Sequence, residues 1–510
     1  MIRLDHGPVA ANRALAAART PVVTLTLGTT EVLDPGCEAR LATALSDRVA
    51  LAGPLVVHPV RRPWAATPRD ATVRTRGLSL VVRDDAPVPV ALGAGAEPDP
   101  TGDPEPVMAV TGALAVADRD ALLAVGGIPD FADPDVALLE LSRRLAAVGR
   151  TSVVVPSAVV RDSRRVAVGT DPDAPIATTG AAWTALVRAH GPALRRWAGA
   201  TGPTSFALTV AAPSERIAER WGDWHLAEAL ARALRARGHP VRVGAVDTAD
   251  APTTRAADVH VVIRGLASVR RTAGQRHVLW VISHPEQVTA EECDAADLVL
   301  VASAPFAEHL RGRTRTPVEV MLQATDPERF APRPSDPARA HAVVVVAKSR
   351  NVFRPMVADA IAAGLRPAIH GSGWERFVDP KLIVTDRVDN ADLAAVYCSA
   401  GVLLNDHWDT MREWGFVSNR IFDALACGTP VISDPVPGLA ELFGDAVVTA
   451  DDPTTLRAAV DAILADPVGA RSRAARGGAI VRAEHTFAHR AEQLVDAIRR
   501  HGHAQGAREE

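Results

Sequence analysis

The sequence has few of the features that mark secreted, membrane-spanning or metal-binding proteins. Its 510 residues include four cysteines, which lie far apart with no paired spacing, so neither a disulfide framework nor a zinc site is indicated. No apolar run reaches the length of a transmembrane helix, and the N-terminus has no compact apolar core followed by a cleavage site. These absences predict reduced thiols and a cytoplasmic setting.

Neither sign of charge is in large excess. Lys plus Arg number 56 and Asp plus Glu number 60, so the formal net charge is −4. This balance argues against a general nucleic-acid binder. Aromatic residues make up only 4% of the chain, whereas hydrophobic residues reach 47%, as in soluble globular proteins with large cores.

Short apolar runs rich in β-branched residues recur from Phe206 onward. Runs such as FALTVAAP and HVLWVIS alternate with helix-like stretches, and the alternation restarts after the Pro-rich segment Ala331–Ala340 with AVVVVAK and PVISD. Continuous apolar strands alternating with helices predict parallel sheets covered on both faces. We therefore predict an α/β fold with two tandem Rossmann-like domains, at 205–335 and 336–510, and a ligand cleft between them.

One stretch, SNRIFDALACGTPVISDPVPGLAELF, combines a small-residue helix, a break at Cys-Gly-Thr-Pro and a short apolar strand. On a helix, Arg420 and Asp423 lie three residues apart on one face, and Gly428 ends that helix. Spacing alone is compatible with a surface ion pair. The functional alternative is that the Asp423 carboxylate accepts the ribose hydroxyls of a nucleotide while Arg420 meets its phosphates.

The longer segment WGFVSNRIFDALACGTPVISDPVPGLAEL resembles the nucleotide-sugar-binding motif of group 1 GT-B glycosyltransferases, in the branch related to spore-coat glycosyltransferases. The resemblance implies that Asp423 binds the ribose of the donor. Two departures stand out. The acid is Asp rather than the usual Glu, and the family's partner Glu eight positions earlier is replaced by Gly415, with Glu413 close but out of register.

Further segments of this domain follow in the order that the resemblance implies. AVVVVAKSRNVFRP resembles the strand and loop that bind the diphosphate, HGSGW resembles a second-strand turn, and LLNDHWDTMREWG precedes the ribose motif. The final EHTFAHRAEQLVDAI resembles a C-terminal helix that crosses back. Cations after a strand are also common as solvated loop charges. The residues so implied are Lys348 and Arg354 for catalysis, and Asp423, Arg420, Asn419, Ser418, Arg350, Gly371, Gly373, Asn405 and His407 for donor binding.

The first Rossmann-like domain carries fewer signals. RWGDWHLAEALARALRARGHPVRV resembles the glycosyltransferase opening, which makes Gly222, Asp223 and His225 acceptor-side candidates at a helix N-terminus that favours anions. An ordinary Asp cap beside a His is the alternative. In VISHPEQV, His284 follows a buried strand and is a candidate catalytic base or substrate-orienting group, although a lone His is more often simply hydrogen-bonded.

Residues 1–198 show a fainter resemblance to GT-A glycosyltransferases of family 2. GPVAANRALAAARTPVVTLTLGTTEVLDPG and VTGALAVADRDALLAVGGIPDF resemble its helix, strand and acceptor-side segments; an Ala/Val-rich sequence that mimics the pattern is the alternative. Where a metal-binding Asp-x-Asp should follow the strand, the sequence reads Leu27–Glu31, and Glu31 alone is a poor ligand set. We predict a degenerate, non-catalytic GT-A-like domain and neither a bound metal nor another cofactor.

The resemblance implies a metal-independent glycosyltransferase of the hexosyltransferase type. It would move a sugar from a nucleoside-diphosphate sugar to a glycan, lipid-linked or small-molecule acceptor in cell-surface polysaccharide or glycoconjugate synthesis, with retention at the anomeric carbon. We expect a cytoplasmic chain, or one peripheral at the inner membrane face, with no nucleic-acid partner; a homo-oligomer is compatible with the sequence.

Two other functions were weighed. A catalytically inactive nucleotide-sugar-binding or assembly protein with the same fold is favoured by the missing acid at Gly415. A Rossmann dehydrogenase fits poorly, because no strand is followed by a Gly-x-Gly-x-x-Gly loop.

Overall fold

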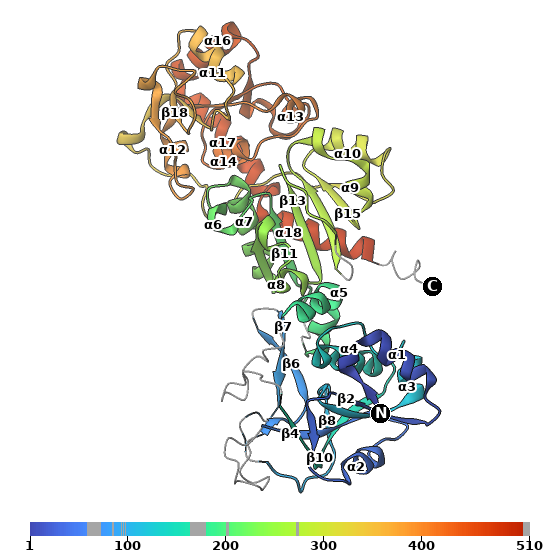
Figure 1. Cartoon of the computed structure of the whole chain (residues 1–510). Helices are drawn as coiled ribbons and strands as arrows, with labels where there is room; N and C mark the ends of the chain where they lie inside the picture. Colours follow the sequence, from blue (N-terminus) through green and yellow to red (C-terminus); the bar gives the residue numbers. More distant parts are fainter. Residues whose placement is uncertain are drawn as a thin grey trace. The chain divides into compact units, whose positions relative to one another are not determined.

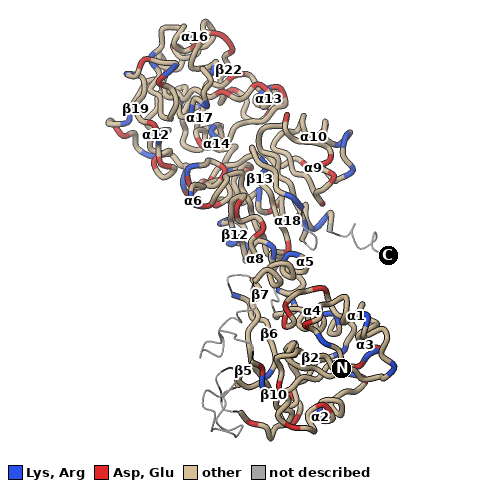
Figure 2. Tube along the Cα trace, in the orientation of Figure 1, with Lys and Arg blue, Asp and Glu red and all other residues tan. Residues whose placement is uncertain are grey.

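The computed structural model describes residues 1–58, 73–83, 86–92, 94, 96, 98–163, 180–199, 203–271 and 275–502 (Figure 1). The chain divides into two compact units. The first consists of Met1–Gly202, Asp250–Asp258 and Thr272–Gln275, and the second of Pro203–Ala249, Val259–Arg271 and Arg276–Glu510. Each described sheet lies within one unit. Along both units, basic and acidic residues are interspersed (Figure 2).

The first unit is built on an eight-stranded mixed sheet of order β1-β2-β9-β4-β10-β3, with β5 beside β4 and β8 beside β10. Successive residues of its strands point to opposite faces. Leu51 and Val154 belong to one apolar cluster with helices α1, α3 and α4, whereas Ala52 and Val153 belong to another with α2. Apolar side chains therefore cover both faces of this sheet.

The elements of the first unit have the following bounds: β1 (Ile2–Arg3), α1 (Pro8–Ala17), β2 (Val22–Thr26), β3 (Thr30–Val32), α2 (Cys37–Thr43), β4 (Val49–Val57), β5 (Val73–Thr75), β6 (Leu78–Arg83), β7 (Ala86–Ala91), β8 (Glu105–Val107), β9 (Leu114–Asp118), α3 (Arg119–Ala124), α4 (Pro134–Ala147), β10 (Thr151–Asp162), α5 (Ala181–Trp197) and α8 (Pro252–Arg255). Strands β6 and β7 form a separate antiparallel hairpin.

The segment that would carry a GT-A metal site is structurally ordinary. Glu31 lies in the edge strand β3, where its carboxylate forms an exposed ion pair with Arg161 at 2.9 Å. Asp135 is buried at the start of α4 and accepts a hydrogen bond from the Gly112 amide at 2.6 Å. Among the described residues, no group of three or more His, Cys, Asp or Glu side chains could hold a metal ion.

The second unit contains two six-stranded sheets in which every strand pair is parallel. Their orders are β12-β11-β13-β14-β15-β16 and β19-β18-β17-β20-β21-β22. The strand β13, with the sequence VHVVIR, is buried at all six residues, as a strand covered on both faces should be. The predicted α/β class with two Rossmann-like sheets is confirmed. Within the described ranges, no helix is both long and apolar enough to cross a membrane.

The N-terminal Rossmann-like domain contains β11 (Phe206–Val210), α6 (Glu215–Ala218), α7 (Gly222–Ala236), β12 (Val241–Gly244), β13 (Val259–Arg264), β14 (Arg276–Val281), α9 (Ala290–Asp294), β15 (Leu298–Val301), α10 (Ala304–Arg311) and β16 (Val318–Val320). The C-terminal one contains β17 (His341–Val346), α11 (Pro355–Ala362), β18 (Ala368–His370), β19 (Ile383–Thr385), α12 (Leu393–Ser399), β20 (Ala400–Asn405), α13 (Asp409–Glu413), α14 (Asn419–Ala426), β21 (Val431–Ser433), α15 (Leu439–Phe443), β22 (Val447–Thr449), α16 (Pro453–Ala465) and α17 (Pro467–Glu484).

The last helix, α18 (Phe487–Gly502), returns to the N-terminal Rossmann-like domain, as the resemblance predicted. Its apolar residues Phe487, Leu494 and Ile498 join the core built around that domain's sheet. Where the chain crosses back, Thr325 and Thr486 form a parallel bridge, and the buried Arg490 side chain donates to the Leu322 carbonyl at 2.6 Å. This crossing fastens the two Rossmann-like domains together.

A second connection runs through the segment 408–416, which contains α13. Phe416 of this segment belongs to the core of the N-terminal domain, with its ring centroid 5.5 Å from that of Phe306. Trp414 contacts Phe306 edge-on at 5.4 Å, and the Trp414 carbonyl accepts a hydrogen bond from the Ser303 hydroxyl. The segment thus belongs to one domain by sequence and to the other by packing.

Candidate active site

A cleft lies between the two Rossmann-like domains of the second unit, as two adjoining cavities. The Asp423 cavity has a volume of about 320 Å³, and the Lys348 cavity has a volume of about 540 Å³. Both are lined by Gly222 and His225 from α7 and by Arg350 and Arg420 from the C-terminal domain.

Most of the residues proposed from the sequence line one cavity or both. The Asp423 cavity is lined by Gly222, Asp223, His225, His284, Arg350, Ser418, Asn419, Arg420 and Asp423. The Lys348 cavity adds Lys348, Arg354 and Gly371. Of the described candidates, Gly373, Asn405 and His407 lie behind these walls.

Asp423 is buried on α14 and does not form an exposed ion pair. Its Oδ1 accepts a hydrogen bond from Thr325 Oγ1 at 2.7 Å, and its Oδ2 accepts one from Asn419 Nδ2 at 2.8 Å. Burial raises the pKa of Asp423 to about 8, since the loss of hydration outweighs both hydrogen bonds. Without a ligand, this carboxyl therefore carries a proton in much of the population at neutral pH.

Arg420 bonds to Asn405 rather than to Asp423. Asn405 Oδ1 accepts hydrogen bonds from Arg420 Nη1 at 2.6 Å and from Ser418 Oγ at 3.0 Å, while its Nδ2 donates to Ser433 Oγ at 3.1 Å. Burial also lowers the pKa of the Arg420 guanidinium. Asn405 thereby holds Arg420 and the start of α14 against the end of β20.

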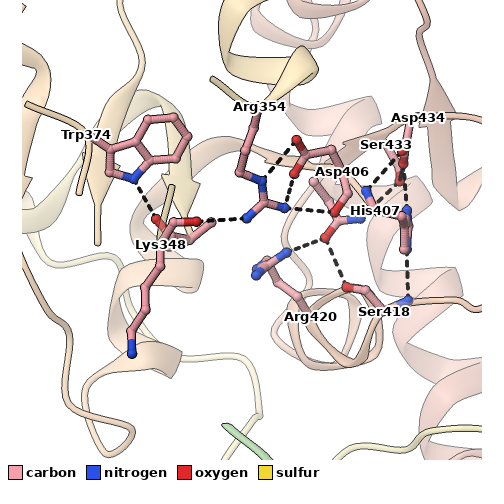
Figure 3. A network of polar contacts seen from close by, with 11 residues as sticks. Lys348, Arg354, Trp374, Asp406, His407, Ser418, Arg420, Ser433 and Asp434 are labelled. Atoms are coloured by element: carbon pink, nitrogen blue, oxygen red, sulfur yellow. Dashed lines mark hydrogen bonds and ion pairs between the residues drawn. The ribbon is translucent and has the colours of Figure 1, made fainter. Parts of the chain in front are cut away.

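His407 is occupied on both ring nitrogens (Figure 3). Its Nδ1 lies 2.6 Å from Asp434 Oδ1, and its Nε2 lies 2.9 Å from the Ser418 amide, which donates to it. Burial would raise the pKa of Asp434, but hydrogen bonds from the His407 side chain and amide and from Ser433 hold it below its ordinary value. His407 therefore positions the start of α14. The sequence made His407 a donor-binding candidate, but in the structure both of its ring nitrogens contact other residues of the protein.

Arg354 is also engaged by the protein. Its Nε donates to Asp406 Oδ2 at 3.1 Å, its Nη2 contacts Asp406 Oδ1 and the Asp406 carbonyl, and its Nη1 donates to the Lys348 carbonyl at 3.3 Å. The Lys348 side chain is exposed and points away from this network (Figure 3). Lys348 can thus meet an anion directly, while Arg354 holds the loop that carries it.

The turn after β18 packs against the same loop. A Cβ at Gly371, where φ is 147°, would lie 2.1 Å from the Ala347 carbonyl oxygen, and a Cβ at Gly373, where φ is 82°, would lie 2.7 Å from Ser349 Oγ. Ser349 also donates its backbone amide to the Ser372 carbonyl at 3.0 Å. Close packing against the backbone of the Lys348 loop therefore requires glycine at position 371, where bare backbone also lines the Lys348 cavity, and the left-handed φ favours glycine at position 373.

Left-handed backbone marks both sides of the cleft. In the described part of the chain, the non-glycine residues with positive φ are His284, Arg350 and Asn351. The Arg350 guanidinium carbon lies 5.0 Å from the centre of the Trp408 ring, a cation–π contact. Burial, together with the nearby Arg354 and Arg420, lowers the pKa of Arg350 to about 10.

The acceptor-side candidates lie in the first turn of α7. Burial raises the pKa of Asp223, although Arg350 and His284 oppose this. His225 Nε2 lies 2.9 Å from the Glu219 carbonyl, and burial lowers the His225 pKa. Asp223 thus places a partly buried carboxyl in the cleft, opposite the cationic side of the C-terminal domain.

The structure gives a reason for glycine at position 415, where the sequence resemblance would place an acid. It ends α13 with φ at 73°, and a Cβ there would lie 3.0 Å from the Pro437 carbonyl and 3.2 Å from Pro305 Cγ. A side chain at this position would strain the backbone and press on Pro305 of the other domain. Packing of segment 408–416 against the N-terminal domain therefore disfavours, at this position, the acid that the sequence resemblance would lead one to expect.

Sequence reasoning missed several residues of the site, among them Thr325 and Trp408. Thr325 lies in the connection after β16, and only the fold brings it to Asp423. Trp408 stands next to the candidate His407, so an aromatic side chain after a strand was an available signal.

Comparison with known proteins agrees with the class suggested by these motifs. Residues 348–496 match a family described as Glycosyl transferase-like, which supports glycosyltransferase chemistry for the C-terminal Rossmann-like domain. No curated protein matches the chain.

Several solved structures are similar in part. Sucrose-phosphate synthase from Thermosynechococcus elongatus has 16% identity and a TM-score of 0.46, covering 59% of this chain and 100% of that one. HepE from Anabaena in complex with UDP and glucose has 13% identity and a TM-score of 0.43, covering 58% and 99%. A glycosyltransferase from Rickettsia africae has 10% identity and a TM-score of 0.42, covering 59% and 99%.

Proposed function

We propose that the second unit transfers a sugar from a nucleoside-diphosphate sugar to an acceptor hydroxyl in this cleft. One observation carries the proposal: a buried carboxylate, Asp423, and a cationic loop beside a glycine turn line adjoining cavities. The family match of residues 348–496 supports the same chemistry.

Asp423 suits the ribose of the donor. Each of its oxygens accepts one hydrogen bond from the protein and retains a lone pair for a further donor. Two vicinal hydroxyls that donate to this carboxylate would favour its ionised form and restore the hydrogen bonds that burial removed.

The Lys348 cavity suits the diphosphate. Its lining contains Lys348 and five arginines against two acids; the basic residues are Arg220, Lys348, Arg350, Arg354, Arg387 and Arg420, and the acids are Glu219 and Asp386. Fixed cations at the departing phosphate stabilise the charge that develops there. We therefore propose a mechanism in which these side chains, rather than a metal ion, assist the leaving group.

In the proposed step, the acceptor oxygen forms a bond to the anomeric carbon of the sugar. The bond from that carbon to the β-phosphate oxygen breaks, and its electron pair leaves with the nucleoside diphosphate. The hydroxyl proton leaves the acceptor, with His284 on the opposite wall as the group that receives or orients it.

The test combines binding and turnover by the full chain. Calorimetry with UDP, GDP, ADP and CDP should show binding of at least one nucleoside diphosphate, and Lys348→Ala should weaken it. Hydrolysis of the corresponding nucleotide sugars should then release that diphosphate. A folded chain that binds none of the four would overturn the proposal.

Binding without turnover would favour the second candidate, a nucleotide-sugar-binding or assembly protein. The absence of the second acid at Gly415, where packing excludes a side chain, is the observation in its favour.

The narrower parts of the proposal rest on the sequence resemblance. They are a hexosyl donor, a glycan, lipid-linked or small-molecule acceptor, and a role in cell-surface polysaccharide or glycoconjugate synthesis at the cytoplasmic side of the membrane. In this proposal the first unit is a degenerate GT-A-like domain with a scaffolding or acceptor-binding role, because Glu31 is paired with Arg161 where a metal ligand would be expected.

A further inference from the structure

We infer that Glu286 is a positioning residue that fixes the imidazole of His284 and ties its orientation to Thr410 of the C-terminal Rossmann-like domain. The inference rests on the proposed function, in which His284 faces the substrates. It assigns a role to a residue that does not line either cavity and that, although it lies in the segment VISHPEQV, was not a site candidate from the sequence.

The two oxygens of Glu286 have different partners. Its Oε1 lies 2.9 Å from His284 Nδ1, and its Oε2 accepts a hydrogen bond from Thr410 Oγ1 at 2.7 Å. Glu286 lies in the short 3-10 turn Pro285–Gln287 of the N-terminal domain, whereas Thr410 lies in α13 of the C-terminal domain. A single carboxylate therefore bridges the two sides of the cleft.

The charge of Glu286 determines the tautomer of His284. Partial burial would raise the pKa of Glu286, but the hydrogen bonds from Thr410 and His284 outweigh it and hold that pKa below its ordinary value. An ionised carboxylate only accepts hydrogen bonds. Nδ1 of a neutral His284 must therefore carry the proton, which leaves the lone pair on Nε2, the nitrogen that Glu286 does not contact.

The backbone of His284 is in an unusual conformation. The residue has φ 54° and ψ 53°, in the left-handed region, and its carbonyl accepts the Gln287 amide at 3.1 Å. Such a conformation is strained for a residue other than glycine and persists where surrounding contacts hold it. His284 also lines the Asp423 cavity, so the strained residue is the one at the substrate wall.

The other groups around His284 come from three elements. Asp223 of α7 interacts electrostatically with His284. It also interacts with Arg350, which lies in the loop after β17. The Trp408 ring lies 6.1 Å from the imidazole, tilted by 48°. Trp408 and Thr410 thus reach the His284–Glu286 pair from the same segment, 408–416, which Trp414 and Phe416 anchor in the N-terminal domain.

This arrangement gives Glu286 a specific consequence for the reaction. With Nδ1–H held, Nε2 can accept a hydrogen bond from a substrate hydroxyl in the cleft. Without the carboxylate, the imidazole can rotate or adopt the opposite tautomer, which presents a donor where an acceptor is needed. The effect should fall on turnover and not on the affinity for a nucleoside diphosphate.

The tautomer of His284 can be measured directly on the full chain. Long-range ¹H–¹⁵N correlation spectra of protein labelled with ¹⁵N-histidine distinguish Nδ1–H from Nε2–H, and the His284 signals are those lost in His284→Phe. We expect the Nδ1–H tautomer in the wild type, loss of that preference in Glu286→Gln, and a partial loss in Thr410→Val. Glu291→Gln, which removes an exposed acid of α9, is the matched control and should leave the spectrum unchanged.

Two readouts separate this inference from the proposed function. An Nε2–H tautomer in the wild type, or identical His284 signals in Glu286→Gln, would overturn the role of Glu286. Failure to bind UDP, GDP, ADP or CDP would overturn the proposed function and leave the tautomer result standing. For a nucleotide sugar that the wild type hydrolyses, Glu286→Gln should lower kcat about tenfold or more with KM unchanged.

Discussion

Thr325 Oγ1 donates a 2.7 Å hydrogen bond to Asp423 Oδ1, and this bond joins the end of one Rossmann-like domain to helix α14 of the other. Thr325 is fully buried, and its backbone also binds the chain that leads into α18, with its amide donating to the His485 carbonyl at 2.9 Å. The Asp423 carboxylate, proposed to bind the donor ribose, is thus held at the place where the chain crosses between the two domains.

Replacing Asp423 should weaken donor binding. Asp423→Ala removes the carboxylate proposed to accept two ribose hydroxyls, and we expect nucleoside diphosphate affinity to fall by roughly 2–4 kcal/mol. Calorimetry measures this directly. Asp445→Ala, at an exposed acid of the same domain that pairs with Arg476, should leave affinity unchanged. A folded Asp423→Ala variant with wild-type affinity would remove Asp423 from the donor site.

The same residue predicts a pH dependence of stability. Burial raises the pKa of Asp423 to about 8, so between its ordinary range and pH 8 the folded state binds more protons than the unfolded state. The stability linked to this group is fully present below its ordinary pKa and is lost as pH rises through about 8. The free energy of unfolding, measured by urea titration, should therefore fall less steeply with rising pH in Asp423→Asn than in the wild type. Parallel pH profiles of the two proteins would contradict the raised pKa.

The parallel sheets were predictable from sequence because their strands are apolar throughout, as in VHVVIR of β13. The roles of the side chains that support the site could not be predicted in this way. His407 stood in a plausible position, but its partner Asp434 is far along the chain, and only the pairing of β20 with β21 brings the ends of those two strands together. Sequence spacing likewise placed Arg420 beside Asp423, whereas burial directs Arg420 to Asn405 and Asp423 to Thr325.

Activity should persist when divalent metal is removed. The Lys348 cavity supplies basic side chains for the leaving diphosphate, and Glu31 of the first unit is paired with Arg161 rather than gathered with other acids. Hydrolysis of a nucleotide sugar should therefore proceed at a similar rate in EDTA and in added magnesium or manganese. A strict requirement for either metal would indicate that chemistry occurs at another site.

Restoring an acid at the position of Gly415 should destabilise the protein rather than recover a missing catalytic group. Gly415 has φ at 73°, and its Cβ would lie 3.0 Å from the Pro437 carbonyl and 3.2 Å from Pro305 Cγ. The left-handed backbone alone costs roughly 1–2 kcal/mol with any side chain, and the contact with Pro305 adds strain between the domains.

Gly364 provides the matched control, since its φ is also 73° but a Cβ there would meet only Arg457 Nη1 at 4.0 Å. Gly364→Ala should therefore show the backbone cost alone, and Gly415→Ala should lose more stability than Gly364→Ala in urea unfolding. Gly415→Glu should lose at least as much as Gly415→Ala, because the longer side chain must also pass Pro305. If Gly415→Ala and Gly364→Ala were equally stable, the packing of segment 408–416 would not explain the missing acid, and loss of function would become the better account of that substitution.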